Sequence, residues 1–230
     1  MHIGLIGGIG PAATIAYYDR LTRLCRDAGR PLELTIVHAD SPTMIANLLA
    51  DRREDQAAAF AALIARLKAA GADCAAITSI AGHFCFAETR RLSSLPLVSA
   101  LQPLDDHLVA AGQRRVGILG VEVVMRTHLY GQLTRTEVVA FDGDLAALGG
   151  VYLDIAKSAV CTDDQRATLF DAGRAMIDRG ADAMVLAGTD LGLAFDGHDP
   201  GFPVVDTVDV HVAVLADLAL DRRTIEDVSA

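Results

Sequence analysis

Short apolar runs alternate with amphipathic helical patterns along the whole 230-residue chain. This alternation is typical of β-α units, in which helices cover a parallel sheet. Several of the runs are almost continuously apolar, as expected for strands that are buried on both faces. We therefore expect an α/β fold. The predicted strands cover about residues 2–6, 33–38, 73–79, 96–98, 115–119, 137–140, 182–186 and 203–205, and the main predicted helices about residues 12–28, 51–70, 101–111, 145–159, 163–179 and 207–220.

The two halves of the chain repeat one sequence pattern. Gly71-Ala72-Asp73 precedes a strand that stops at Ser79, and Gly180-Ala181-Asp182 precedes a strand that stops at Gly188. A short strand beginning with proline follows each of them. We predict two similar α/β lobes with parallel-rich sheets, related by a pseudo-two-fold axis. The N-terminal lobe would hold residues 1–100, the second lobe residues 101–206, and helix 207–220 would pack back on the first lobe.

The two repeated strand ends are the predicted site. Ligands of open parallel sheets bind beyond the carboxyl ends of the strands. We therefore expect the turns Ser79–His83 and Gly188–Asp190 to face one another across a ligand cleft between the lobes. Small residues can simply permit tight turns, but their repetition favours a site whose backbone N–H groups hold a small carboxylate. The predicted substrate contacts in these turns are Ala81, Gly188 and Thr189.

A glycine-rich loop follows the first strand. Gly8 and Gly10 have the first spacing of a dinucleotide fingerprint, but Ala13 stands where its third glycine belongs. Pro11 suits the first position of a helix. We therefore predict that Gly8, Ile9 and Gly10 form a tight strand-to-helix turn whose N–H groups bind a carboxylate rather than a nucleotide.

Charge and composition exclude several classes of partner. The formal net charge of -10 argues against a nucleic-acid or anionic-membrane surface. No apolar run approaches the ~20 residues that span a bilayer, and the N-terminus has no basic leader. The cysteines lack metal-ligand spacing, so we expect reduced thiols in a soluble, cytoplasmic protein without a metal. They are Cys25, Cys74, Cys85 and Cys161.

Only one histidine, His83, lies beside a predicted turn, and imidazole can act as a general acid or base near neutral pH. Ser79 and Asp190 are the other candidate catalytic groups. Lys157 is a candidate partner for a substrate carboxylate, although a solvated lysine fits the same pattern.

The sequence resembles the aspartate/glutamate racemase superfamily, and within it the aspartate racemase branch. The segment Ile3–Thr14 is similar to the opening motif GxxGGMGPxAT, and the twin Gly-Ala-Asp segments and Val205-Asp206-Thr207 with His211 resemble the same branch. The resemblance implies two α/β lobes around a cleft, often as a dimer, with no pyridoxal phosphate or metal. It also implies inversion of an amino acid by two cysteines, one on each face of the α-carbon, and substrate roles by position for Asp40, Lys157 and Thr189.

The chain departs from this family at both reactive positions. The usual CNTxH motif is Ser79–His83 here, and the usual GCTE motif is Ala187–Asp190, so the two cysteines become Ser79 and Gly188. A thiol with a pKa near ~8.5 can carry a proton. A serine hydroxyl does so poorly without a neighbouring base, and a glycine cannot. A symmetric two-thiol mechanism is therefore excluded.

Three hypotheses follow. The first is a cofactor-independent enzyme that acts next to the carboxylate of a small amino or carboxylic acid by isomerisation, elimination or decarboxylation, using Ser79, His83 or Asp190. The second is an amino-acid racemase in which another group, such as Cys85, has become the base. The third is a non-catalytic protein that binds small acids.

Overall fold

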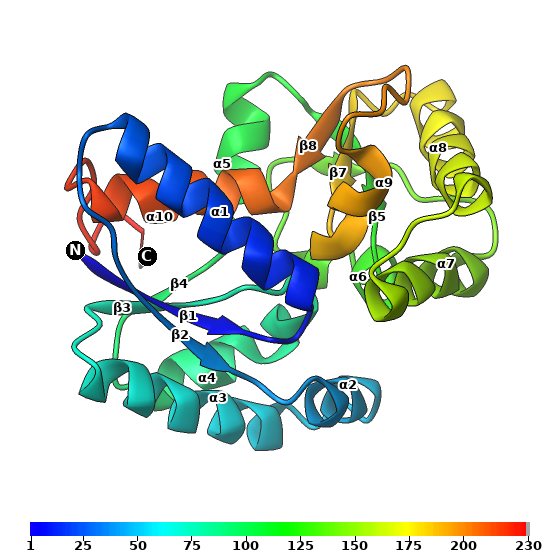
Figure 1. Cartoon of the computed structure of the whole chain (residues 1–230). Helices are drawn as coiled ribbons and strands as arrows, with labels where there is room; N and C mark the ends of the chain where they lie inside the picture. The colour runs from blue at the N-terminus through cyan, green and yellow to red at the C-terminus, as the bar shows by residue number, and fades with distance from the viewer. Residues whose placement is uncertain (229–230) are drawn as a thin grey trace. The chain divides into compact units, whose positions relative to one another are not determined.

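The computed structural model describes residues 1–228, which form two compact units. Unit 1 contains residues 1–100 together with the C-terminal residues from His211, and unit 2 contains residues 101–210. Each unit is built on a four-stranded sheet with helices packed on it (Figure 1).

The sheet of unit 1 has the strand order β2-β1-β3-β4, and all its strands are parallel. Its two central strands carry the core, because Ile3, Leu5 and Ile6 of β1 and every residue of β3 are buried. The strands are β1 (His2–Gly7), β2 (Glu33–His38), β3 (Cys74–Ile77) and β4 (Leu97–Val98). The helices are α1 (Pro11–Asp27), α2 (Ser41–Leu49), α3 (Arg53–Ala69), the 3-10 turn η1 (Ala81–Cys85), α4 (Phe86–Leu92) and α10 (Thr207–Ala219), which belongs to unit 1 from His211 onward.

The sheet of unit 2 has the order β6-β5-β7-β8 and is also parallel throughout. Its central strand β7 is fully buried. The strands are β5 (Arg115–Leu119), β6 (Glu137–Val138), β7 (Ala183–Leu186) and β8 (Val204–Asp206). The helices are α5 (Gln102–Ala110), α6 (Glu122–Arg126), the 3-10 turn η2 (Leu129–Gly131), α7 (Leu145–Ser158), α8 (Asp163–Asp178), the 3-10 turn η3 (Thr189–Leu191) and α9 (Gly192–Phe195).

The two sheets repeat one topology, since the second strand, the first, the third and the fourth lie side by side in each. This confirms the predicted α/β fold with two similar parallel sheets. It also makes β3 and β7 equivalent, so the turns that begin at Ser79 and at Gly188 occupy the same place in their respective units. Whether these turns face one another stays a prediction.

The repeated Gly-Ala-Asp segment has a structural task in both units. The Asp73 carboxylate accepts the His2 N–H at 2.7 Å, and the Asp182 carboxylate accepts the N–H groups of Arg114 and Arg115 at 2.8 Å each. These two backbone bonds hold the pKa of Asp182 below its usual range. In each unit, therefore, an aspartate before the third strand holds the start of the first strand and fixes how the two strands pair.

The structure also corrects the sequence predictions. A helix that we did not predict, α2, follows β2, and the Asp40 side chain caps it by accepting the Thr43 N–H at 2.9 Å. Strand β3 ends at Ile77, two residues earlier than predicted, and the 3-10 turns η1 and η3 follow β3 and β7. These tight turns depend on local hydrogen bonds that hydrophobic periodicity does not report.

Helix α10 is tied to α1 by a buried polar contact. The Tyr17 hydroxyl and Nδ1 of His211 lie 2.8 Å apart, and both side chains are fully buried. The His211 ring also lies edge-on to the ring of His83, with 6.4 Å between the centroids. Burial, together with the neighbouring His83, lowers the pKa of His211 to about 3. Both rings are therefore neutral where they pack.

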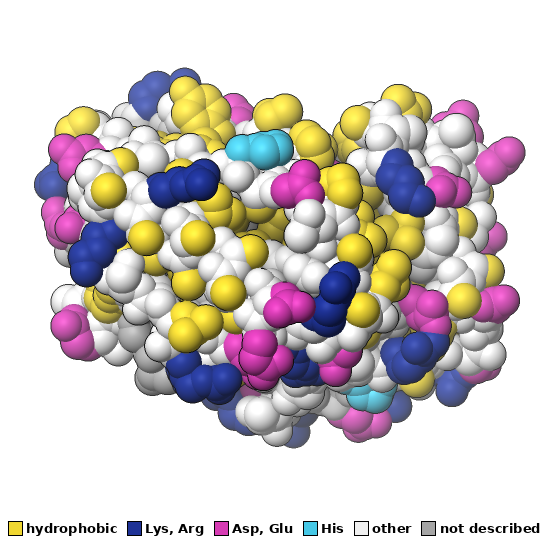
Figure 2. Space-filling model, turned by 90° about the horizontal axis from the view of Figure 1, so that it is seen from below, with side chains coloured by type: hydrophobic (Ala, Val, Ile, Leu, Met, Phe, Trp, Pro, Cys, Tyr) yellow, Lys and Arg dark blue, Asp and Glu magenta, His cyan; other side chains and the backbone are white. Residues whose placement is uncertain are grey.

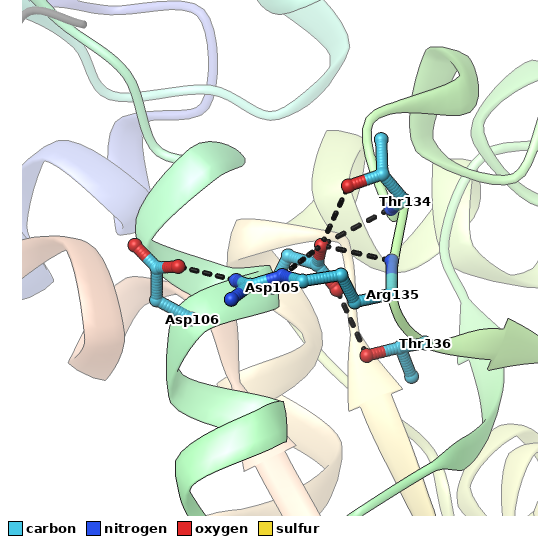
Figure 3. A network of polar contacts seen from close by, with 5 residues as sticks. All are labelled: Asp105, Asp106, Thr134, Arg135 and Thr136. Carbon is cyan, nitrogen blue, oxygen red and sulfur yellow. Dashed lines mark hydrogen bonds and ion pairs between the residues drawn. The ribbon is translucent and has the colours of Figure 1, made fainter.

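In unit 2 a buried carboxylate holds the segment that precedes β6. Asp105 of α5 is only 4% exposed, and its oxygens accept hydrogen bonds from the hydroxyls of Thr134 and Thr136 and from the backbone N–H groups of Thr134 and Arg135, at 2.8–3.2 Å (Figure 3). The Arg135 guanidinium lies 3.4 Å from the same carboxylate. Burial alone would raise the pKa of Asp105, but these donors outweigh it and lower the pKa. The two-residue strand β6 thus depends on α5 for its position.

Basic and acidic side chains are interspersed with apolar ones on the face that Figure 2 shows, and no continuous basic patch forms in this view. Over the described residues, no helix combines the length and the apolar character needed to cross a bilayer.

Replacing Asp105 tests the anchor before β6. Asp105→Asn replaces one acceptor oxygen by an amide N–H₂ group, which would face the hydroxyl and N–H donors that now bind the carboxylate. We therefore expect the free energy of unfolding, measured by urea denaturation, to fall by about 2–3 kcal/mol. The matched control is Asp106→Asn, because Asp106 is the neighbouring, exposed partner of Arg135. This control should change the free energy of unfolding by less than about 0.5 kcal/mol. Equal effects of the two substitutions would contradict the role of Asp105 in holding the segment before β6.

The buried histidines predict acid sensitivity. Burial lowers the pKa of His83 to about 4 and that of His211 to about 3, from 6.5. Below pH 6.5 these two histidines bind protons in the unfolded chain but stay neutral in the folded chain. The free energy of unfolding therefore falls as the pH drops from 6.5 toward 4. Each histidine should contribute a slope of about 1.4 kcal/mol per pH unit once its unfolded form is protonated.

The measurement is urea denaturation at pH 7, 6 and 5. We expect His211→Phe to lose part of the acid slope, while His198→Phe, at an exposed position, should keep the wild-type slope. Identical slopes for wild type and His211→Phe would show that His211 is not held neutral in the fold.

Candidate functional site

The turn after β3 is held by Ser79, the serine of the predicted site. Ser79 is 5% exposed, and its Oγ accepts the Gly82 N–H at 3.3 Å. Its carbonyl oxygen accepts a hydrogen bond from Nδ1 of His83 at 2.7 Å. Ser79 therefore both begins the turn and holds η1 in place, and its hydroxyl retains its own proton for a further contact.

His83 is fixed as a neutral ring. Its Nδ1 donates to Ser79, its Nε2 accepts the Ala100 N–H at 3.1 Å, and the ring stacks on Phe86 with 5.2 Å between the centroids. Burial lowers the pKa of His83 to about 4. Both nitrogens are hydrogen-bonded to the backbone, which argues against a role for His83 as a general acid or base. Its contacts make it a brace between the turn after β3 and the segment after β4.

The Cys85 thiol is poorly placed to be the base that the displaced-thiol hypothesis requires. It is fully buried, with Sγ 3.7 Å from the Gly82 carbonyl oxygen and 3.6 Å from Oγ1 of Thr89. Burial raises the pKa of Cys85 to about 11, which disfavours the reactive thiolate. These contacts argue against the displaced-thiol hypothesis.

The turn after β7 brings a carboxylate and a phenol together. Gly188 precedes η3, and Thr189 and Asp190 within η3 are buried. The Tyr152 hydroxyl of α7 donates to Oδ2 of Asp190 at 3.3 Å. Burial, and then the charge of Asp190, raises the pKa of Tyr152 well above its usual value of 10. The phenol is therefore uncharged at neutral pH and donates a hydrogen bond to Asp190.

Tyr152 is the site residue that the sequence interpretation missed. It lies on the buried face of α7 with Leu148, Gly149 and Ile155, at the i, i+1, i+4, i+7 spacing of a core-facing stripe. The available signal was a tyrosine in that stripe, since a buried tyrosine needs a partner for its hydroxyl.

The glycine-rich loop is held from both sides. The Gly8 N–H donates to Oγ1 of Thr14 at 2.9 Å, and the Ile9 carbonyl oxygen accepts from the Ser41 hydroxyl at 3.0 Å. Gly8 has φ of +90°, and a side chain there would meet the ring of His38. The N–H of Gly8 is thus used internally, which corrects its place among the predicted carboxylate donors. For Ile9 and Gly10 that role stays a prediction.

Two further predicted substrate contacts have other roles. Asp40 is exposed and caps α2 through Thr43, whose hydroxyl and N–H lower the pKa of the Asp40 carboxyl. Lys157 is exposed in the last turn of α7, where its positive charge interacts favourably with the negative end of the helix dipole. Both side chains therefore have helix-terminal roles in the structure, and their contacts with a substrate stay predictions. No cluster of three metal-ligating side chains occurs among residues 1–228.

Solved structures with similar folds include two racemase relatives. A Yersinia pestis protein assigned as an Asp/Glu racemase aligns with a TM-score of 0.83 and 22% identity over 96% of this chain and 100% of that one. An aspartate racemase homologue from Pyrococcus horikoshii aligns with a TM-score of 0.76 and 23% identity over 95% and 99%. Arylmalonate decarboxylase aligns more distantly, with a TM-score of 0.52 and 16% identity over 95% and 92%.

These structural alignments establish the shared two-lobed fold. The family assignment rests on a separate comparison of the sequence with a family model. The model of the Asp/Glu/hydantoin racemase family matches residues 6–215, which is most of the chain, and the chain therefore belongs to this family.

Proposed function

We propose that this chain is an enzyme that acts at the carbon next to a carboxylate, on a small amino or carboxylic acid, without thiol chemistry. The reaction would be an isomerisation, an elimination or a decarboxylation. One observation carries the proposal. The equivalent strand ends after β3 and β7 present a hydroxyl at Ser79 and no side chain at Gly188, where the racemase pattern has two cysteines.

Family membership supports the class of reaction. Among the proteins of similar fold are glutamate racemases and an arylmalonate decarboxylase, whose names describe changes at a carbon next to a carboxylate. These reactions share one chemical demand, which is to hold negative charge that develops beside the carboxylate while a proton leaves or arrives. A change of reactive side chains can therefore alter the reaction while the fold stays the same.

The proposed roles follow from the contacts. Ser79 would contact the substrate through its hydroxyl, since Oγ already accepts the Gly82 N–H and its own proton is left to donate. Asp190 would be the proton-accepting carboxylate, and the Tyr152 hydroxyl would hold its Oδ2. Backbone N–H groups beside Ala81 and Thr189 would contribute to carboxylate binding. His83 would keep the Ser79 turn in shape.

The test is hydrogen exchange in deuterium oxide. Wild-type protein is incubated with a panel of amino acids and mono- and dicarboxylic acids, and NMR follows both α-proton loss and product formation. We expect turnover of at least one acid. Ser79→Ala should lower kcat by about 100-fold or more, the usual scale for loss of a proton-handling group. Cys85→Ala should retain activity within about 3-fold, since its thiol takes no part.

Ser94→Ala, at an exposed serine, is the matched control and should behave as wild type. Circular dichroism melting of each variant separates lost folding from lost chemistry. Activity that survives Ser79→Ala but disappears in Cys85→Ala would establish a displaced thiol instead. Saturable binding across the panel with neither exchange nor product would establish a binding protein.

A further inference from the structure

Tyr152 and Gly188 share one space in unit 2. Tyr152 is 8% exposed and projects from the buried face of α7 onto the start of the turn after β7. A Cβ atom built on Gly188 would lie 2.4 Å from Cε2, 2.7 Å from Cζ and 3.0 Å from Cδ2 of the Tyr152 ring. Real Cβ atoms do not approach a ring carbon so closely, so no side chain fits at position 188 while the ring is in place.

The backbone does not itself require glycine here. Gly188 has φ of -137° and ψ of 117°, an extended conformation that every amino acid adopts. The requirement for glycine therefore comes from the ring alone. This differs from Gly8, where a positive φ and the His38 ring both exclude a side chain.

The same tyrosine has a polar task. Its hydroxyl donates to Oδ2 of Asp190 at 3.3 Å, and both side chains are buried. A phenol in this position restricts the orientation of the carboxylate, because it holds one of the two carboxylate oxygens.

We propose that Tyr152 is a positioning residue: its ring excludes a side chain at position 188, and its hydroxyl orients Asp190. The positioning part rests on the proposed function, because it requires Asp190 to act on a substrate. The exclusion part does not, because it concerns the fold of unit 2 alone.

A thermal-melting cycle tests the exclusion. Gly188→Cys alone should lower Tm by about 3–10 °C, as expected when a well-packed site is overfilled. In a Tyr152→Ala background, where the ring is absent, the same substitution should lower Tm by less than about 2 °C. In a Tyr152→Phe background, which keeps the ring, Gly188→Cys should lower Tm by the same amount as in the wild-type background. If Tyr152→Ala does not fold, Tyr152→Leu replaces it.

The matched control is Gly150→Cys on α7, the helix that carries Tyr152, because a Cβ at position 150 would meet nothing within 4 Å. It should leave Tm nearly unchanged in every background. Wild-type Tm in Gly188→Cys, or an equal loss with and without the ring, would overturn the exclusion.

Kinetics test the positioning. Tyr152→Phe should lower kcat about 10-fold with KM unchanged, because only the orientation of the reacting carboxylate is lost. A structural role alone would change Tm but neither constant. Wild-type kcat in Tyr152→Phe would overturn the positioning part. If the wild-type protein turns over no acid in the panel, the proposed function fails, and the positioning part fails with it, while the melting cycle still decides the exclusion.

Discussion

The structure depends on a carboxylate at the start of the third strand of each unit. Asp73 holds the N–H of His2, and Asp182 holds the N–H groups of Arg114 and Arg115, so the first and third strands begin at a fixed offset. This constraint brings Ser79 and Gly188 to equivalent positions after β3 and β7 and makes their chemistry comparable.

The two strand ends then diverge through their neighbours. After β3, a neutral and fully engaged His83 stabilises the turn around the Ser79 hydroxyl. After β7, the Tyr152 ring fills the side-chain space of Gly188, and the phenol turns toward Asp190. The strand end of unit 1 carries a hydroxyl and that of unit 2 a phenol-carboxylate pair, so the two strand ends differ in chemistry although the units share a topology.

Much of this could be predicted from sequence, and the remainder depends on contacts between distant segments. The α/β fold, the repeat and the family followed from apolar periodicity, the twin Gly-Ala-Asp segments and the opening glycine motif. Tyr152 was missed because it meets Asp190 across 38 positions in sequence. The contact of His83 with Ala100, 17 residues away, could not be predicted from sequence either. The N-cap role of Asp40, in contrast, is local, so the sequence alone could have predicted helix α2 after it.

The central claim is that this racemase-family chain works without thiols, and a cysteine-free variant tests it most directly. Cys25, Cys74, Cys85 and Cys161 are replaced by alanine, the fold is verified by circular dichroism, and α-proton exchange in deuterium oxide is measured per folded molecule. Our account predicts that exchange continues at a rate within about 3-fold of wild type, which corresponds to less than about 0.7 kcal/mol in the activation free energy. Complete loss of exchange in the folded variant would contradict it.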